Sequence, residues 1–458
     1  MTELKGNNSS EYRLIGPSDD GKVSDLLSGM NAKDSRQRLQ ALISEWLRME
    51  NLVVLTGAGS SRSSGGKLMG DLEASVLATV RAMPLIAPTA AAILDSRLQP
   101  TDEGKKTWLS FEDWLSYLVN AAHVAGSDSS PFTGVIWKGD LKPNTKELNW
   151  LVDRIGKAIM IECTLRLPND VSSSDAEVTS PHLAFLAKLV ARDSNLGRPH
   201  LFTLNYDTLF EQTLELLGIQ YFDGFTGRAN ARFDPSVYGL DIYWPGEISE
   251  GRVRRYDKFL HFYKLHGSVH WHIKDSELRA RHPDLAAIQT YRQLELAERA
   301  KKLDEFAASF PSVGILPTAN KFTQTLTMPF AHLFRSFQVR LSAPQTFLLV
   351  MGYGFGDDHV TRVIETALMN PSLVMLVVEP DPKSATIKRI MKYKELGKRA
   401  FVLTSTENAH AASPFKLATF DDFARNIMPD VQWLEDFLRL RRFEKQIQAS
   451  RSPNSDEE

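Results

Sequence analysis

The sequence predicts an α/β fold built on a doubly wound parallel sheet with helical insertions. The first observation is a run of branched aliphatic residues, Leu52–Leu55, which is typical of a strand buried on both faces. The second is a regular alternation of short apolar runs and amphipathic segments over residues 346–403, which indicates parallel strands joined by right-handed crossover helices. The third is that several apolar runs end in glycine or polar residues, the place where such sheets bind ligands.

Composition limits the functions to consider. The chain has 458 residues, of which 43% are apolar and 24% charged, enough for one large domain with insertions or about two to three smaller ones. Its 54 lysines and arginines nearly balance 56 aspartates and glutamates, so the overall charge predicts neither nucleic-acid nor membrane binding. Residues 1–22 are polar and lack the apolar core of a signal peptide, which predicts a cytoplasmic protein.

Cysteine and histidine usage argues against a metal site. Cys163 is the single cysteine, which excludes an internal disulfide and a four-cysteine zinc module, and we expect it to be a small buried side chain. His270 and His272 flank Trp271 without an acidic or cysteine partner pattern, so we expect them to lie at the surface or in the core. No metal ligand is predicted.

Hydrophobic spacing defines the elements of the amino-terminal half. Residues 1–34 are polar and are expected to be flexible. The predicted elements that follow are a helix at Ser35–Met49, the strand at Leu52–Leu55, helices at Ser110–Ala122 and Glu147–Leu165, and a polar loop at Pro168–Ser180.

The carboxyl-terminal half contains most of the predicted sheet. The predicted strands are Pro199–Leu204, Phe259–Leu265, Thr346–Met351, Leu373–Val378 and Ala400–Leu403. The predicted helices are Tyr206–Leu217, Leu285–Phe310 (outside the sheet), Pro329–Leu341, Asp358–Met369, Lys383–Tyr393, Phe420–Met428 and Val431–Ile447. The apolar face of the last helix packs on the core or mediates oligomerisation, two possibilities that the sequence leaves open.

The glycines after the first strand suggest a phosphate site. The segment Gly57-Ala58-Gly59-Ser60-Ser61 lets the chain turn tightly, and its backbone amides and the following helix can face an anion. The third glycine of the usual dinucleotide motif is absent, and Arg62 stands in its place. A purely structural strand-to-helix turn is the alternative.

Three further strand ends carry polar or glycine residues. Asn205 and Asp207 follow the second strand, where an ordinary role would be to end the strand and cap the next helix. His266 precedes a glycine at the end of the third strand, where a histidine in a turn is the ordinary reading. Gly352 and Gly354 follow a late strand and permit close approach of a ligand. Together with the glycine segment after the first strand, these make four such strand ends in one chain, and that combination favours a functional interpretation over the ordinary ones.

Taken in order, these motifs resemble the catalytic core of the sirtuin family. The matching segments are Gly57–Ser60, Thr203-x-Asn205-x-Asp207, His266-Gly267 and the late glycine loop, and the resemblance spans roughly residues 51–403. It implies a Rossmann-like domain that binds NAD and breaks its nicotinamide–ribose bond. The implied catalytic domain covers 35–405 and contains helical insertions at about 66–180 and 270–340. Carboxyl-terminal helices over 406–448 and a disordered tail over 449–458 are expected to follow it.

Departures from the family pattern argue against protein deacylation as the activity. A chain with one cysteine cannot build the zinc module of the protein deacylases, and Leu204 stands where they have a glutamine. The glycine pair Gly65-Gly66, the Asn205-Tyr206-Asp207 segment and the late glycine loop are more similar to sirtuin-like NAD hydrolases of bacterial antiphage defence (abortive infection). The layout resembles the subunit of this group that pairs with a hexameric HerA-type ATPase, which implies a homo-oligomer or an ATPase partner. No membrane contact is expected, direct nucleic-acid binding is not indicated, and the sequence leaves open whether nucleic acid is contacted.

The resemblance implies a role for each site residue. Asn205 orients water and ribose, His266 accepts a proton, and Asp207 holds a ribose hydroxyl or the carboxamide unless it caps its helix. The residues expected to bind NAD, here a substrate, are Gly57, Ala58, Gly59, Ser60, Ser61, Gly352, Gly354 and Glu379. A module that binds NAD or ADP-ribose without chemistry, and a protein deacylase, are the alternatives.

Overall fold

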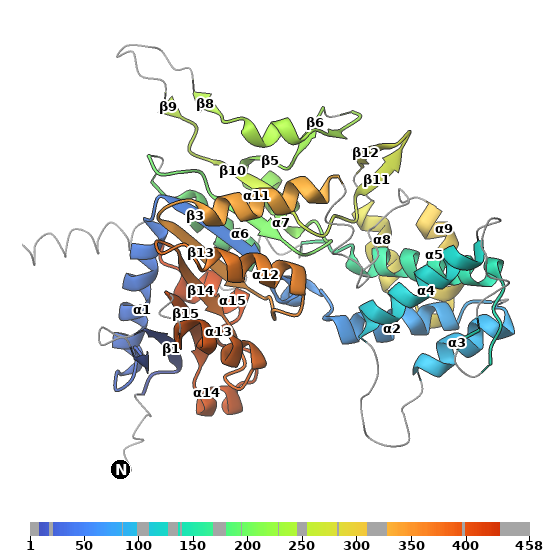
Figure 1. The fold of residues 1–458 in the computed structure, drawn as a ribbon, viewed down its shortest axis with the longest axis horizontal. Coiled ribbons are helices and arrows are strands. Elements are labelled where there is room, and N and C mark those ends of the chain that lie inside the picture. Colours follow the sequence, from blue (N-terminus) through green and yellow to red (C-terminus); the bar gives the residue numbers. More distant parts are fainter. Residues whose placement is uncertain are drawn as a thin grey trace, which may run out of the picture.

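The computed structural model describes most of the chain. The described residues are 9–17, 22–84, 86–98, 110–126, 136–137, 140–167, 180–193, 195–227, 229–244, 254–281, 284–308, 328–395 and 399–430. Figure 1 shows a sheet flanked by helices, with a separate group of helices beside it. The predicted polar loop after Pro168, the helix at Val431–Ile447 and the tail over 449–458 lie outside the described residues.

The central sheet confirms the predicted α/β class. It has nine strands in the order β2-β1-β15-β14-β13-β3-β4-β10-β5. The strands are β1 (Tyr12–Pro17), β2 (Val23–Asp25), β3 (Asn51–Thr56), β4 (His200–Thr203), β5 (Gln220–Phe222), β10 (Phe259–Lys264), β13 (Thr346–Met351), β14 (Val374–Val378) and β15 (Ala400–Ser405). The seven strands from β15 to β5 pair in parallel, and β1 and β2 add an antiparallel edge.

The middle strands are buried because helices cover both faces of the sheet. One core joins the sheet to α1 (Ala32–Leu47), α6 (Pro181–Val190), α7 (Leu209–Leu216) and α15 (Phe420–Asp422) with its π-helical continuation η5 (Phe423–Ile427). A second core joins the other face to α11 (Phe330–Ser342), α12 (Asp358–Ala367) and α13 (Ala385–Glu395). Buried on both faces, β3 and β13 therefore consist almost entirely of apolar residues.

A third core belongs to a helical body beside the sheet. It contains α2 (Met69–Arg81), α3 (Pro88–Leu98), α4 (Phe111–Gly126), α5 (Thr145–Cys163), α8 (Leu285–Arg292) and α9 (Leu296–Ala308). The single helix expected over 285–310 is thus two helices, and both lie outside the sheet as predicted. Helices from the two predicted insertions therefore meet in one body, although more than 100 residues separate the end of α5 from the start of α8.

Smaller elements complete the structure. A second sheet contains β6 (Phe225–Thr226), β7 (Arg232–Phe233), β11 (Trp271–Lys274) and β12 (Glu277–Ala280), and β8 (Tyr243–Trp244) pairs with β9 (Arg254–Arg255). Helix α14 is Glu407–Ala412, and the 3₁₀ helices η1 and η4 are Ala58–Ser64 and Pro235–Gly239. No helix among the described residues is both long and apolar enough to cross a membrane.

The amino terminus differs from the sequence expectation. Residues 1–34 were expected to be flexible because they are polar, but Tyr12–Pro17 form a strand that pairs with β15. Tyr12 and Leu14 are buried there, and the Tyr12 hydroxyl donates to Asp422 at 2.9 Å, so this strand binds the carboxyl-terminal segment. The polar composition of residues 1–34 as a whole concealed this short strand, whose residues do not alternate strictly between apolar and polar. Helix α6 was also not predicted.

Candidate functional site

The register of the sheet brings four strand ends to one edge. Met351 pairs with Thr56, Thr56 with Thr203, and Thr203 with Lys264, across β13, β3, β4 and β10. Since these strands are parallel and end in register, the residues that follow each of them emerge side by side. The loops predicted from sequence to carry the site are therefore neighbours.

The first glycine loop packs directly on the late one. The Gly59 amide donates to the Gly352 carbonyl at 3.0 Å. A Cβ at Gly57 would lie 2.6 Å from the Gly352 oxygen, and one at Gly59 would lie 2.7 Å from the Gly352 Cα. Gly352 itself has a φ of +64°, and a Cβ there would lie 2.5 Å from the Ser60 nitrogen. Close approach of two backbones thus requires glycine at these positions, whether or not a ligand binds.

This packing uses amides that the sequence analysis assigned to a phosphate. The Gly57 amide donates to the Met351 carbonyl at 3.0 Å, and the Ser60 amide donates to Gly57 at 2.9 Å. Together with Gly59, three of the five loop amides are engaged within the protein. The structural-turn alternative therefore accounts for these glycines physically, and an anion at this loop must also find other donors.

Beneath this contact lies what we call the serine–amide network, formed by Ser60, Ser61, Asn205 and Asp207. The Asn205 amide nitrogen donates to the Ser61 hydroxyl at 2.7 Å and to the Ser60 hydroxyl at 3.1 Å. Ser60 in turn donates to the Gly57 carbonyl at 2.9 Å, and Ser61 donates to Asp207 Oδ2 at 2.6 Å. All four residues are buried, with 0 to 7% of their surfaces exposed.

The network fixes the orientation of the Asn205 amide. Each serine hydroxyl has one proton, and both protons are already donated to other acceptors, so the serines must receive hydrogen bonds from Asn205. That requirement turns the amide nitrogen toward the serines and the amide oxygen away from them. The oxygen is the group that can accept a hydrogen bond from a water or a ligand hydroxyl.

Asp207 has two functions in the structure. Its Oδ1 accepts the Leu209 amide at 3.1 Å just before α7, but the N-cap residue of that helix is Thr208, so Asp207 is not the helix cap that the sequence suggests. Its Oδ2 accepts from Ser61. The contact with the start of α7 and the contact with Ser61 do not exclude each other, because each uses a different carboxylate oxygen.

A buried ion pair supports the loop that carries Asp207. Lys264 Nζ donates to Glu211 Oε1 at 2.8 Å and also to the Asp207 carbonyl, and both side chains are at most 3% exposed. Burial raises the pKa of Glu211 to about 7, although the Lys264 ammonium acts in the opposite direction. Sequence reasoning missed this pair. Its signal was a lysine within an otherwise apolar and aromatic strand, two residues before His266.

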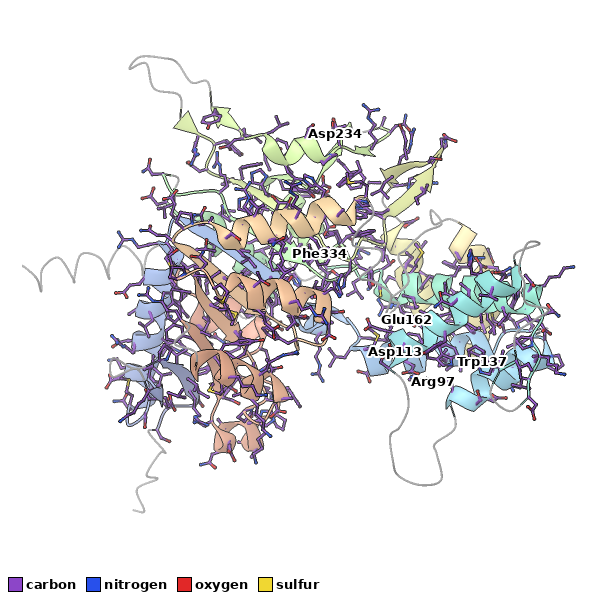
Figure 2. All side chains as sticks on the ribbon, viewed as in Figure 1. Arg97, Asp113, Trp137, Glu162, Asp234 and Phe334 are labelled. Atoms are coloured by element: carbon purple, nitrogen blue, oxygen red, sulfur yellow. The ribbon has the colours of Figure 1, made fainter. Side chains whose placement is uncertain are left out.

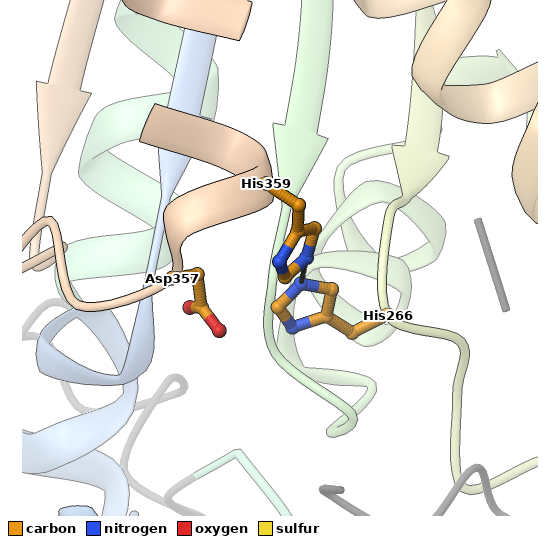
Figure 3. Close-up of side chains that lie close together, drawn as sticks. All are labelled: His266, Asp357 and His359. Atoms are coloured by element: carbon orange, nitrogen blue, oxygen red, sulfur yellow. Dashed lines mark hydrogen bonds between the residues drawn. The ribbon is translucent and has the colours of Figure 1, made fainter. Parts of the chain in front are cut away.

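His266 lies two residues after the end of β10 and is buried beside a second histidine. Its Nε2 lies 3.0 Å from Nε2 of His359, at the start of α12, and the Asp357 carboxylate lies in the same group. Figure 3 shows the two imidazoles facing each other, with Asp357 on the loop before the helix. His359 and Asp357 were not predicted as site residues. The Asp-x-His spacing after the late glycine loop was the available signal.

An open pocket of about 450 Å³ adjoins the glycine loops. Its lining includes Gly59, Gly352, Gly354 and Glu379, which were predicted to act together. Arg62, Phe415 and Asp421 also line it, the last two from the carboxyl-terminal segment, and the Arg62 guanidinium lies 5.4 Å from the Phe415 ring centre. Burial raises the pKa of Glu379, whose Oε1 accepts the Asp381 amide at 3.1 Å. Arg62 had been noted only as a departure from a motif.

Other candidate residues have structural roles. His270 is buried and its Nδ1 lies 2.8 Å from the Ser268 hydroxyl, whereas His272 lies half-buried on β11. Cys163 is half-buried rather than fully buried as expected, and desolvation still raises the pKa of its thiol to about 12, which suits an unreactive side chain. Ala58 is exposed at the start of η1.

The helical body is anchored to the chain just after the first glycine loop. Lys67 pairs with Glu162 at 2.9 Å, and Ser75 donates to the same carboxylate at 2.7 Å. Figure 2 shows Glu162 at the end of α5 nearest the sheet. Although burial opposes ionisation, the hydrogen bonds from Lys67 and Ser75 lower the pKa of Glu162, so the carboxylate is charged at neutral pH.

Comparison with known proteins gives one family match. Residues 199–397 match the SIR2-like domain family, a range that contains Asn205, Asp207, His266 and the late glycine loop. No curated protein matches the chain significantly. The match supports a sirtuin-like protein and fits an NAD-related activity.

Proposed function

From this SIR2-like similarity, we propose that the protein is an NAD glycohydrolase, which cleaves the nicotinamide–ribose bond to give ADP-ribose and nicotinamide. The observation that supports it most is the serine–amide network, which turns the Asn205 amide nitrogen toward the two serines next to a shared edge of strand ends. A site for this reaction must stabilise an oxocarbenium-like ribose and deliver water to the anomeric carbon. An oriented amide oxygen is suited to both tasks.

His266 and Asn205 divide the chemistry in this proposal. The nicotinamide leaving group is already cationic, so the reaction needs no strong general acid. Asn205 positions the attacking water or the ribose hydroxyls, and His266 accepts a proton, a contribution of typically about 10² to 10⁴ in rate. Asp207 acts through Ser61, as a positioning residue for Asn205.

The rest of NAD is proposed to lie along the glycine loops. The adenosine half occupies the open pocket, where Glu379 and Gly354 line the wall. Because three loop amides are engaged within the protein, the pyrophosphate needs another cation, and Arg62 in the same pocket supplies it. Arg62 then replaces the contribution of the absent third glycine.

An assay of NAD loss tests the proposal. The purified chain, Asn205→Ala and His266→Ala are compared at equal concentration, each checked for intact fold. We expect the wild type to release nicotinamide and both variants to lose at least a hundredfold in rate. Equal rates for all three proteins would contradict the proposal. NAD binding without turnover would favour the regulatory module, and turnover that requires an acylated lysine peptide would favour the deacylase.

We further propose that the hydrolase is a cytoplasmic effector of antiphage defence. The support is the resemblance of its motifs to that group, together with the cost to a cell of a permanently active NAD hydrolase. Control would come from a homo-oligomer or from a hexameric HerA-type ATPase. Mass measurement of the chain with and without such an ATPase tests this, and a monomer indifferent to the ATPase would contradict it.

A further inference from the structure

We infer that His266, Asp357 and His359 form a binding site for a divalent transition-metal cation of the Zn²⁺ class. His266 lies in the loop after β10, and Asp357 and His359 lie at the amino-terminal end of α12; Figure 3 shows the two imidazoles facing each other with Asp357 beside them. This group is separate from any cysteine-based zinc module, which the chain cannot form.

The distances suit such a cation. One ligand atom from each residue lies within 4.8 Å of the others, and the two Nε2 atoms are 3.0 Å apart. In a tetrahedral site, zinc–nitrogen distances of about 2.0–2.1 Å place two ligand atoms roughly 3.3 Å apart. The 3.0 Å between the two Nε2 atoms is close to that separation, and the Asp357 carboxylate, within 4.8 Å of them, must move closer to complete the site.

The donor set also selects the class of cation. Imidazole nitrogens suit Zn²⁺, Cu²⁺, Fe²⁺ and Ni²⁺, whereas Mg²⁺ and Ca²⁺ prefer oxygen ligands. Two Nε2 atoms 3.0 Å apart can share one proton in a hydrogen bond, and a cation can take the place of that shared proton. Asp357 and His359 are partly exposed while His266 is buried, which leaves a route for entry.

The fold holds these ligands in place. The Asp357 carbonyl accepts from the Tyr353 hydroxyl at 3.0 Å and from the Thr361 amide at 3.0 Å. The His359 ring lies 5.2 Å from the Phe334 ring. The helix dipole makes the amino-terminal end of α12 positive, which disfavours binding of a cation there. The negative charge of the Asp357 carboxylate at that end offsets this unfavourable interaction.

One consequence rests on the proposed function. A bound cation occupies a nitrogen of His266 and places two positive charges beside a ribose that becomes positive in the transition state. Bound Zn²⁺ is therefore expected to lower NAD turnover, and a chelator to restore it.

Metal titration tests the site independently of turnover. The full chain is freed of metal with a chelator and titrated with Zn²⁺ by calorimetry and with Co²⁺ by visible absorption. We expect one site per chain, and at least a tenfold weaker affinity in His359→Gln and in Asp357→Asn. The control His123→Gln changes an exposed histidine of the helical body and should bind as the wild type does. Thermal melting confirms that each variant is folded.

The outcomes separate the two proposals. Absence of a site in the wild type, or wild-type affinity in folded His359→Gln and Asp357→Asn, would overturn the metal site whatever the turnover. Saturable binding that these variants weaken, in a protein that does not hydrolyse NAD, would support the metal site and contradict the hydrolase.

Discussion

The serine–amide network and the open pocket are built differently, and none of the four network residues lines the pocket. In the network, buried hydroxyl, amide and carboxylate groups hydrogen-bond to one another, so its geometry is fixed before any ligand arrives. The pocket is an open space of about 450 Å³, lined partly by the carboxyl-terminal segment. The difference suggests that the network serves the chemical step and the pocket serves binding. Mutations in the two regions should therefore separate kcat from KM.

The largest expected effect is on the support beneath the network. Lys264→Met leaves Glu211 buried without its cation, and we expect a loss of about 3–5 kcal/mol in the free energy of unfolding. The double variant Lys264→Met/Glu211→Leu removes both charges and should recover most of the loss. Chemical denaturation measures both. A double variant no more stable than Lys264→Met would show that the pair does not act as a unit.

The carboxyl group of Glu211 should also make the stability of the protein depend on pH. The pKa of Glu211 is raised to about 7 by burial, above its unfolded value, so the native state retains a proton that the unfolded state has lost. Its contribution to stability is therefore present below about pH 4.5 and is lost as the pH rises through 7. Denaturation of Glu211→Gln should lack this decrease, and an unchanged pH profile would contradict the assignment.

The next largest expected effect is the loss of stability when the contact between the two glycine loops is disturbed. Gly352→Ala adds a Cβ at positive φ and against the Ser60 nitrogen, with an expected cost of about 3 kcal/mol in stability. Gly354→Ala is the matched control, because its Cβ would meet nothing within 4 Å. Thermal melting of both variants measures the difference, and equal melting temperatures would contradict the required close approach.

Within the network, Ser61 should affect the chemical step. Ser61→Ala removes the acceptor of the Asn205 amide and the donor to Asp207, and we expect kcat to fall about ten- to a hundredfold with little change in KM. Ser63→Ala is the control, because Ser63 donates instead to Asp421 at the pocket. Steady-state NAD kinetics give both constants. If Ser61→Ala changed only KM, Ser61 would serve binding rather than the chemical step, which contradicts the proposal.

The smallest expected effect belongs to the pocket. Arg62→Ala removes the proposed pyrophosphate cation, so KM for NAD should rise about tenfold while kcat stays near the wild-type value. Arg62→Lys should keep part of the affinity because it keeps the charge. A fall in kcat without a change in KM would place Arg62 with the network rather than the pocket.

Sequence reasoning located the strands better than the contacts between their ends. Apolar runs such as Leu52–Leu55 identify buried strands, because burial on both faces excludes polar residues. The hydrogen bond from Asn205 to Ser61 joins residues 144 positions apart and depends on strand order and register, which a single sequence does not encode locally. His359 was missed for the same reason, since its partner His266 lies 93 positions away.

Elements outside the parallel core were predicted least well. Strand β1 is short and lies in a polar region, and it is stabilised by pairing with β15 rather than by its own composition. The two helical insertions could be recognised as helices, but their union in one body follows from packing between distant segments. Both features depend on tertiary contacts, which a local sequence pattern does not predict.

The source of the oxygen in the product tests the central claim most directly. The wild type and Asn205→Ala are incubated with NAD in water enriched in heavy oxygen, and the products are analysed by mass spectrometry. The account predicts ADP-ribose that carries one heavy oxygen atom at the anomeric carbon, formed by the wild type and at least a hundredfold more slowly by Asn205→Ala. Unlabelled or cyclised product, or labelled product formed equally fast by both proteins, would contradict it.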